Sequence, residues 1–365
     1  MKCATGFDME QFALAIKGWY RLHRRHLPWR ETTDPYKIWI SEIILQQTRV
    51  VQGHDYFLRF VERFPTVRDL AEAPEDEVLK LWQGLGYYSR ARNLHASARM
   101  VMEEGGVFPV EYEDVRRLKG VGDYTAAAIC SFAYGRPYAV VDGNVCRVLS
   151  RWLGIDVPID TARGKKIFAT VAQELLDKEA PSLYNQAIMD FGALQCVPQA
   201  PDCPSCPLRD SCVARKEKRV TELPVKQHKT RVIDRYFNYI YVRAGAFTFI
   251  RRRNSDDIWR GLYEFPLLES PRMLRDEELY TAEAVQAWIQ PGEKPVFRCL
   301  QRHVRHVLSH RVLHVAFHEA VLPEDTRSFA GFERISSDSL ELYAVPRLLH
   351  RFMERFLTEH DRVEE

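Results

Sequence analysis

The chain has 365 residues, of which 46% are hydrophobic and 28% are charged. This length exceeds what one compact core usually holds, so two domains are expected. The formal net charge is only +2, so affinity for a polyanion has to come from local patches. Charge-free runs such as 124–135 are far shorter than the roughly 20 apolar residues of a membrane span. Residues 1–13 lack the apolar core of a secretory signal. We therefore expect no membrane partner and a reducing compartment, such as the bacterial cytoplasm.

Residues from about 7 to 195 predict successive helices, and no strand-like alternation of useful length interrupts them. The stretches "TAAAICSFAYG" and "NVCRVLSRWLG" both end in glycine, as helices often do. Asp34 and Pro35 have the residue types of an N-cap and a first helical position, which predicts a helix over 36–47. The first half of the chain is therefore expected to be an all-α domain.

Glu42 lies in that predicted helix among the apolar residues Trp39, Ile40, Ile43 and Ile44. An ionised carboxylate buried there without partners would cost several kcal/mol. Glu42 is therefore expected to be paired, protonated or directed into a cleft. The alternative is that it belongs to a solvent-facing stripe of the helix.

The composition changes after residue 217. Residues 218–233 are basic, carry Pro224 and lack a helical apolar face, which predicts a linker. Two β-favouring runs then flank Ala244-Gly245 as in a hairpin, residues 310–322 alternate like a strand, and the segment from Pro346 has helical spacing. The sequence thus predicts an all-α domain over 1–217 and an α+β domain over 234–365.

Four of the eight cysteines cluster, with gaps of six, two and five residues: Cys196, Cys203, Cys206 and Cys212. Four thiolates this close in sequence can surround one metal centre, and ligand count alone leaves zinc and an iron-sulfur cluster both open. The scattered Cys3, Cys130, Cys146 and Cys299 are expected to be buried fillers. The clustered spacing at the end of an all-α domain resembles the 4Fe-4S loop (196–212) of the endonuclease III superfamily of DNA glycosylases.

A second motif, "LKGVGDYTAAAI", supports this resemblance. Gly120 and Gly122 permit a tight turn with exposed NH groups, and a helix starting near Tyr124 adds its N-terminal dipole, which suits a DNA phosphate. Taken alone, an ordinary glycine turn is the alternative. The motif resembles the helix-hairpin-helix (about 113–130), in which proline is usual where Lys119 stands.

The third motif is "YAVVDGNVCRVLSR". Asp142 or Asn144 could merely cap the helix that follows, but Asp142 also matches the active-site aspartate of the superfamily. Removal of a base from deoxyribose passes through an oxocarbenium-like state, which needs a proton for the base and a negative charge near the sugar. Glu42 and Asp142 could divide these tasks, with the apolar setting of Glu42 raising its pKa.

Several further stretches, "LPWR", "SEIILQQTRV", "GLGYYSRARNL" and "VDGNVCRV", resemble the A/G-specific adenine glycosylases, the MutY family, over about residues 10–215. Endonuclease III has a lysine where this chain has Tyr124, and a phenol cannot form that lysine's Schiff base. The resemblance therefore implies a monofunctional enzyme that uses water. It implies that Glu42 protonates adenine N7 and that Asp142, with Tyr124 and Asn144, stabilises the sugar cation.

The resemblance also assigns residues that handle the extruded adenine and the DNA. Arg30 would hold the adenine, Gln47 and Tyr87 would fill the space left in the duplex, and Leu85, Gly120 and Gly122 would contact DNA.

The last third of the chain, through "WRGLYEFP" and "RHVLSHRVLHV", resembles the Nudix-like domain with which this family recognises 8-oxoguanine. The resemblance assigns lesion recognition to Thr48, Leu308, Ser309 and His310, although phenylalanine is usual where Leu308 stands. No Nudix box is found, so this domain is expected to bind without catalysing; a stability module is the alternative.

The sequence thus predicts a monomeric glycosylase, with a 4Fe-4S cluster, that acts on double-stranded DNA containing adenine opposite 8-oxoguanine or guanine. One alternative is a glycosylase for thymine or uracil opposite guanine. Two others are a noncatalytic iron-sulfur DNA-binding or redox-sensing protein and a Nudix hydrolase with a helical appendage. Protein partners cannot be predicted from the sequence.

Overall fold

The computed structural model describes residues 9–227 and 232–360, with the side chains of 357–360 excepted. Cys3 and residues 228–231 of the predicted linker lie outside this description. The chain forms two compact units, one of Met1–Glu72 with Asn93–Lys229 and one of Ala73–Arg92 with Thr230–Glu365. The domain boundaries drawn from the sequence stay a prediction.

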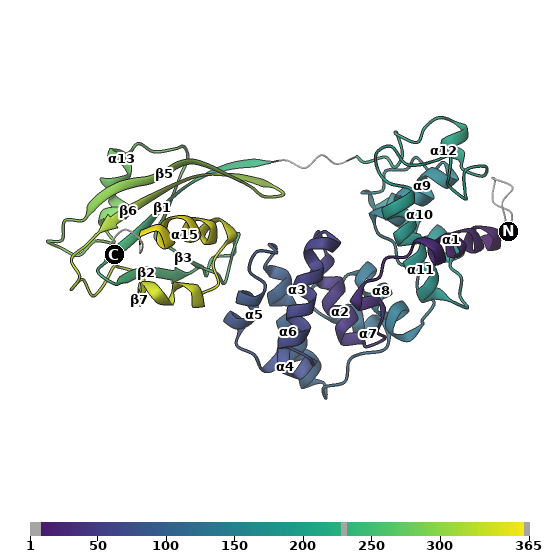
Figure 1. The fold of residues 1–365 in the computed structure, drawn as a ribbon, viewed down its shortest axis with the longest axis horizontal. Coiled ribbons are helices and arrows are strands. Elements are labelled where there is room, and N and C mark those ends of the chain that lie inside the picture. The colour runs from purple at the N-terminus through teal and green to yellow at the C-terminus, as the bar shows by residue number, and fades with distance from the viewer. Residues whose placement is uncertain (1–8, 228–231, 361–365) are drawn as a thin grey trace. The chain divides into compact units, whose positions relative to one another are not determined.

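The first unit is helical, and no strand occurs among its described residues. Figure 1 shows these helices in purple to teal. They are α1 (Met9–His23), η1 (Pro28–Arg30), α2 (Pro35–Leu45), α3 (Val50–Arg63), α4 (Val67–Glu72), most of α6 (Ser89–Glu103), α7 (Tyr112–Arg117), α8 (Asp123–Tyr134), α9 (Gly143–Leu153), α10 (Ala162–Leu175), α11 (Pro181–Asp190), the π-helix η2 (Phe191–Gln195) and α12 (Val213–Lys216).

The ends of these helices follow the predicted signals. The Asp34 side chain accepts a hydrogen bond from the Tyr36 amide at 2.9 Å and caps α2, which ends at Leu45, slightly before the predicted end. Helices α8 and α9 stop at Gly135 and Gly154, which have left-handed φ angles of 61° and 73°. The expected all-α architecture is confirmed.

One core of this unit forms around α9, which packs against α1, α10 and α11. Trp152 of α9 is 1% exposed and stacks on Phe12 of α1, with ring centroids 4.1 Å apart. Burial of one such side chain contributes roughly 2–3 kcal/mol. This packing fixes the N-terminus of α9, where Asp142 lies.

The second unit is built on a sheet of order β3-β2-β1-β6-β5, with β4 paired to β1 and β7 paired to β2. The predicted hairpin is confirmed, because Ala244 pairs with Phe247 across the turn. Strands β1 and β6 run parallel, and β5 and β6 run antiparallel. The strands are β1 (Ile233–Ala244), β2 (Phe247–Arg252), β3 (Tyr263–Glu264), β4 (Leu267–Ser270), β5 (Val296–Val307), β6 (Arg311–Val321) and β7 (Glu333–Ser336).

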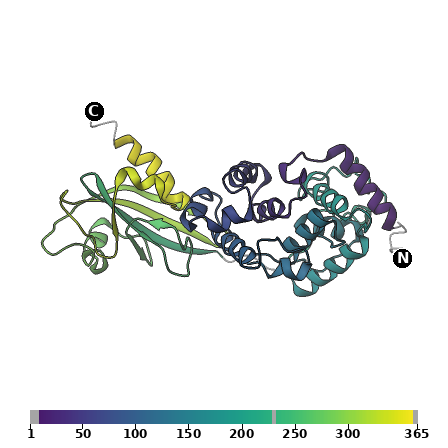
Figure 2. The same cartoon turned by 90° about the horizontal axis from the view of Figure 1, so that it is seen from below.

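Successive side chains along a strand point to opposite faces of the sheet, so each face packs into its own hydrophobic core. On one face lies α15 (Arg347–His360), drawn in yellow in Figure 1 and Figure 2. Phe352 of α15 stacks on Phe317 of β6, with ring centroids 4.2 Å apart. Ile240 and Val242 of β1 face the other core, with α13 (Asp276–Tyr280) and α14 (Glu283–Gln286). The short helix η3 (Ser337–Leu342) precedes α15. The predicted α+β class is confirmed.

Helix α5 (Glu75–Leu81) also belongs to the second unit. Its Glu75 accepts a hydrogen bond from Arg252 of β2 at 2.7 Å, and Lys80 donates to the Tyr343 carbonyl at 3.2 Å. No helix of the described residues is long and apolar enough to cross a membrane.

Candidate active site

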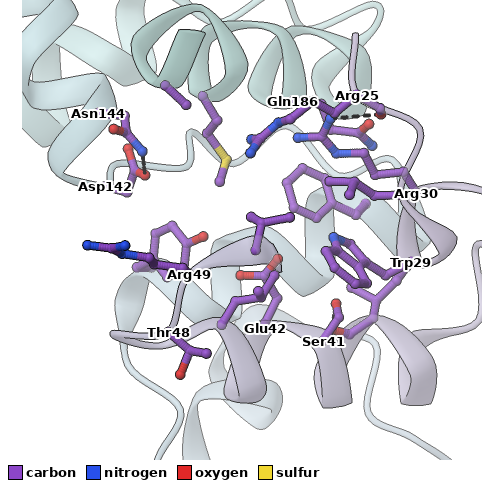
Figure 3. Close-up of a pocket in the computed structure, with 18 residues that line it drawn as sticks. Arg25, Trp29, Arg30, Ser41, Glu42, Thr48, Arg49, Asp142, Asn144 and Gln186 are labelled. Atoms are coloured by element: carbon purple, nitrogen blue, oxygen red, sulfur yellow. Dashed lines mark hydrogen bonds between the residues drawn. The ribbon is translucent and has the colours of Figure 1, made fainter. Parts of the chain in front are cut away.

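A cavity of about 290 Å³ lies in the first unit, between α2, α8, the start of α9 and α11 (Figure 3). It contains residues that the sequence analysis selected from widely separated stretches. Six of the predicted site residues line it: Arg30, Glu42, Thr48, Tyr124, Asp142 and Asn144.

Glu42 is 6% exposed and lines this cavity from α2, so the alternative of a solvent-facing stripe is wrong. Burial raises the pKa of Glu42 to about 7. The Tyr124 hydroxyl, hydrogen-bonded to Glu42, and the Arg30 charge lower this pKa, while the Asp142 charge raises it. Glu42 therefore retains a proton near neutral pH, as a general acid needs.

Asp142 is the N-cap of α9, but it also lines the cavity. One carboxylate oxygen accepts a hydrogen bond from the Val145 amide at 2.7 Å, and the other accepts one from the Asn144 side chain at 2.7 Å (Figure 3). Burial raises the pKa of Asp142, and these hydrogen bonds oppose that shift. Capping thus fixes the carboxylate in place and does not exclude a catalytic role.

The orientation of Asn144 depends on Arg147, which the sequence analysis missed. Arg147 donates to the Asn144 side-chain oxygen at 2.8 Å and to the carbonyls of Gly192 at 2.5 Å and Cys196 at 2.8 Å. Gly192 lies so close that an added Cβ would stand 2.8 Å from the Asn144 backbone oxygen. Hydrogen bonds therefore run from Asp142 to Cys196, the first cysteine of the clustered four.

Arg30 is held by Asp190, which the sequence analysis also missed. Two guanidinium nitrogens of Arg30 donate to Asp190 at 2.6 and 2.8 Å, and Arg25 pairs with the same carboxylate. Asp190 is fully buried. Burial alone raises the pKa of Asp190, but the hydrogen bonds from Arg30 and Arg25 bring it below its usual range. An ionised Asp190 thus fixes the guanidinium of Arg30 at the cavity wall.

The glycine motif forms the expected turn before α8. Gly120 has a left-handed φ of 79°, whereas Gly122 is the N-cap of α8 with a φ of −99° that any residue adopts. The Gln46 side chain donates to the Gly120 carbonyl at 3.3 Å. Only Gly120 is therefore required for the conformation of the turn.

Gln47 and Tyr87 share an unusual backbone, with φ angles of 55° and 48°. A residue other than glycine held in this region costs of order 1 kcal/mol or more, and such strain clusters at functional sites. Gln47 follows α2 in the first unit, whereas Tyr87 and the buried Leu85 belong to the second.

The predicted lesion-reading residues divide between the units. Thr48 lines the cavity of the first, and Leu308, Ser309 and His310 form the turn between β5 and β6 in the second. The Leu308 amide donates to the Arg311 carbonyl at 2.8 Å and closes this turn. Within the second unit, the hydroxyls of Tyr87 and Ser309 contact each other.

The four clustered cysteines line one hollow, together with Arg151. Arg151 donates to the Cys196 sulfur at 3.4 Å and to the Val197 carbonyl at 2.8 Å. No three of these sulfurs lie within 4.8 Å of one another, although a tetrahedral zinc site would bring its sulfurs to about 3.8 Å. An all-thiol donor set is one that a metal centre can use, either zinc or an iron-sulfur cluster.

Two known family models match this chain, each over a different range. Residues 40–173 match the model of the HhH-GPD superfamily of base excision DNA repair proteins, and residues 238–355 match that of the NUDIX domain. The adenine DNA glycosylase of Buchnera aphidicola (strain Bp) is 32% identical over 83% of this chain and 84% of its own length. The chain belongs to the adenine DNA glycosylase family.

Other relatives agree with this membership. The human adenine DNA glycosylase is 41% identical over 59% of this chain and 41% of its own length. A solved structure of a thermostable thymine-DNA glycosylase is 30% identical, covers 57% of this chain and 97% of its own and has a TM-score of 0.54. A non-covalent endonuclease III–DNA complex, at 24% identity and a TM-score of 0.50, shows the same fold over 58% of this chain and 98% of its own.

Family membership makes the protein an enzyme that excises adenine in base excision repair, and DNA is its partner. The predicted enzyme class is confirmed. The alternatives of a noncatalytic sensor and a Nudix hydrolase are not supported. The roles of individual residues in this adenine DNA glycosylase are argued below.

Glu42→Gln is expected to stabilise the protein at pH 8. The pKa of Glu42 is raised from 4.5 to about 7 in the folded state. Ionisation of Glu42 therefore removes stability as the pH rises through about 7, and the contribution is fully present below 4.5. The loss is of order 3 kcal/mol. Urea unfolding at pH 5 and pH 8 measures it. A variant no more stable than the wild type at pH 8 would contradict the shift.

Asp190→Asn is expected to destabilise the protein by about 3 kcal/mol, because it leaves two guanidinium groups without their buried partner. It should also lower adenine excision, since Arg30 loses its fixed orientation. Asp177→Asn is the matched control: Asp177 pairs with Lys17 and does not line the cavity. Urea unfolding and single-turnover excision compare the two variants. Equal excision by both would remove Asp190 from the site.

Proposed function

We propose that this adenine DNA glycosylase acts on adenine opposite 8-oxoguanine or guanine, and that it hydrolyses the N-glycosidic bond without cutting the strand. The observation that carries the chemistry is the pair of carboxylates, Glu42 and Asp142, in one buried cavity. Glu42 keeps its proton, while Asp142 accepts two hydrogen bonds that favour its charge.

In this proposal the extruded adenine enters the cavity beside Arg30. Glu42 gives its proton to adenine N7, so that the base leaves without a full negative charge. Asp142 stabilises the positive charge that develops on the sugar, and Asn144 and Tyr124 orient the two carboxylates. Water completes the hydrolysis, because the phenol of Tyr124 cannot form a Schiff base.

Thr48 at the cavity and several residues outside it receive supporting roles. Gln47 and Tyr87, with their strained backbone, fill the space left by the adenine, Gly120 and Gly122 contact a phosphate, and Leu85 contacts DNA. Thr48, Leu308, Ser309 and His310 read the 8-oxoguanine. Cys196, Cys203, Cys206 and Cys212 hold a 4Fe-4S cluster, which orders the loop that Arg147 and Arg151 anchor. The enzyme acts as a monomer in the bacterial cytoplasm.

A second substrate has one specific observation in its favour. The solved thermostable thymine-DNA glycosylase shares 30% identity with this chain over the catalytic fold. Excision of thymine opposite guanine is therefore the alternative that a substrate test has to include.

The test uses duplexes with adenine opposite 8-oxoguanine, adenine opposite guanine, and thymine opposite guanine, each with and without alkali after incubation. We expect alkali-dependent cleavage at adenine, fastest opposite 8-oxoguanine. Asp142→Asn should slow this by roughly 100-fold or more, because the sugar cation loses its counter-charge. Cleavage without alkali would overturn the monofunctional mechanism, and equal rates opposite guanine and 8-oxoguanine would overturn the lesion preference.

A further inference from the structure

Three potential metal ligands converge in the second unit. Asp276 begins α13, Cys299 lies on β5 and His318 lies on β6. One ligand atom from each lies within 4.8 Å of the other two, and among the described residues no other such group of His, Cys, Asp or Glu occurs. Cys299 and His318 are direct partners across the antiparallel pair, so their side chains extend from the same face of the sheet.

His318 is the most buried member, with 1% exposure. Its Nδ1 atom lies 3.6 Å from an Asp276 oxygen and 3.0 Å from the Tyr280 hydroxyl. Its Nε2 atom is buried without a hydrogen-bond partner. A neutral imidazole nitrogen is the form of histidine that binds a metal.

The donor atoms of these three side chains favour some metal ions over others. A thiolate, an imidazole and a carboxylate together suit zinc, whereas calcium and magnesium prefer all-oxygen sites. The Asp276 side chain is 42% exposed, which leaves access for a water molecule as fourth ligand. We propose that Asp276, Cys299 and His318 bind one zinc ion, which ties α13 to strands β5 and β6.

Binding would displace one proton from the Cys299 thiol to solvent, with a zinc–sulfur bond formed in its place. Zinc would also replace the Tyr280 hydroxyl on Nδ1. This site is separate from the clustered cysteines, because Asp276, Cys299 and His318 all belong to the second unit and the four clustered cysteines belong to the first. It does not depend on the function proposed above.

Arg302 would compete with zinc for the Asp276 carboxylate. Its guanidinium pairs with Asp276 and donates to the Leu274 carbonyl at 3.1 Å. Without zinc, Arg302 supplies the positive charge that Asp276 requires. A zinc ion has to share this carboxylate with Arg302, so removal of the arginine should strengthen zinc binding. A simple ion-pair cluster would show no such effect.

The test uses the full chain with its iron content measured, treated with a chelator, dialysed and then exposed to zinc. Zinc is quantified by mass spectrometry, and X-ray absorption at the zinc edge gives its ligands. We expect one zinc per chain, with one sulfur at about 2.3 Å and nitrogen or oxygen at about 2.0–2.1 Å. Cys299→Ser should weaken binding at least tenfold, whereas Cys146→Ser, a partly buried cysteine outside the site, should not.

Arg302→Gln should bind zinc more tightly than the wild type, and zinc should raise its Tm more. This variant keeps the proposal testable if Cys299→Ser fails to fold. The proposal is overturned if the wild type retains no zinc, or if Arg302→Gln leaves zinc affinity unchanged. A shell of four sulfurs would also overturn it, because that result would place the zinc at Cys196, Cys203, Cys206 and Cys212.

Discussion

The proposed catalytic site depends on the burial of two carboxylates in one cavity. Glu42 and Asp142 both lose hydration there, and each loss raises the pKa of the group. The two carboxylates differ in their partners. Asp142 accepts two close hydrogen bonds at a helix N-terminus, whereas Glu42 lies among apolar residues of α2 and accepts a hydrogen bond from the Tyr124 hydroxyl. These partners favour the charged form of Asp142 beside a protonated Glu42, as the proposed mechanism requires.

The rest of the first unit serves to hold this pair in place. Stacking of Trp152 on Phe12 secures α9, and Asp142 caps its first turn. The Arg147 guanidinium joins Asn144 to the Gly192 and Cys196 carbonyls, so the cysteine loop supports the turn that carries Asp142 and Asn144 without entering the cavity. A metal cluster in that loop would act through this support and need not take part in the chemistry.

Much of this could be predicted because the signals are local. Helix ends at Gly135 and Gly154, the hairpin at Ala244-Gly245 and the cysteine spacing all depend on short stretches of sequence. The burial of Glu42 followed from its apolar neighbours. The roles of Asp190, Arg147 and Gly192 depend on contacts between distant segments, such as Arg30 with Asp190, and no short pattern encodes these. The same holds for the convergence of Asp276, Cys299 and His318.

The central claim is that Glu42 acts in its protonated form. The most direct measurement is the single-turnover rate of adenine release from pH 5.5 to pH 9, compared between the wild type and Glu42→Gln. The pKa of about 7 predicts a wild-type rate that falls about tenfold per pH unit above that value. The variant should show a low rate without this fall. A wild-type rate that stays constant up to pH 9, or a variant with the wild-type rate, would contradict the account.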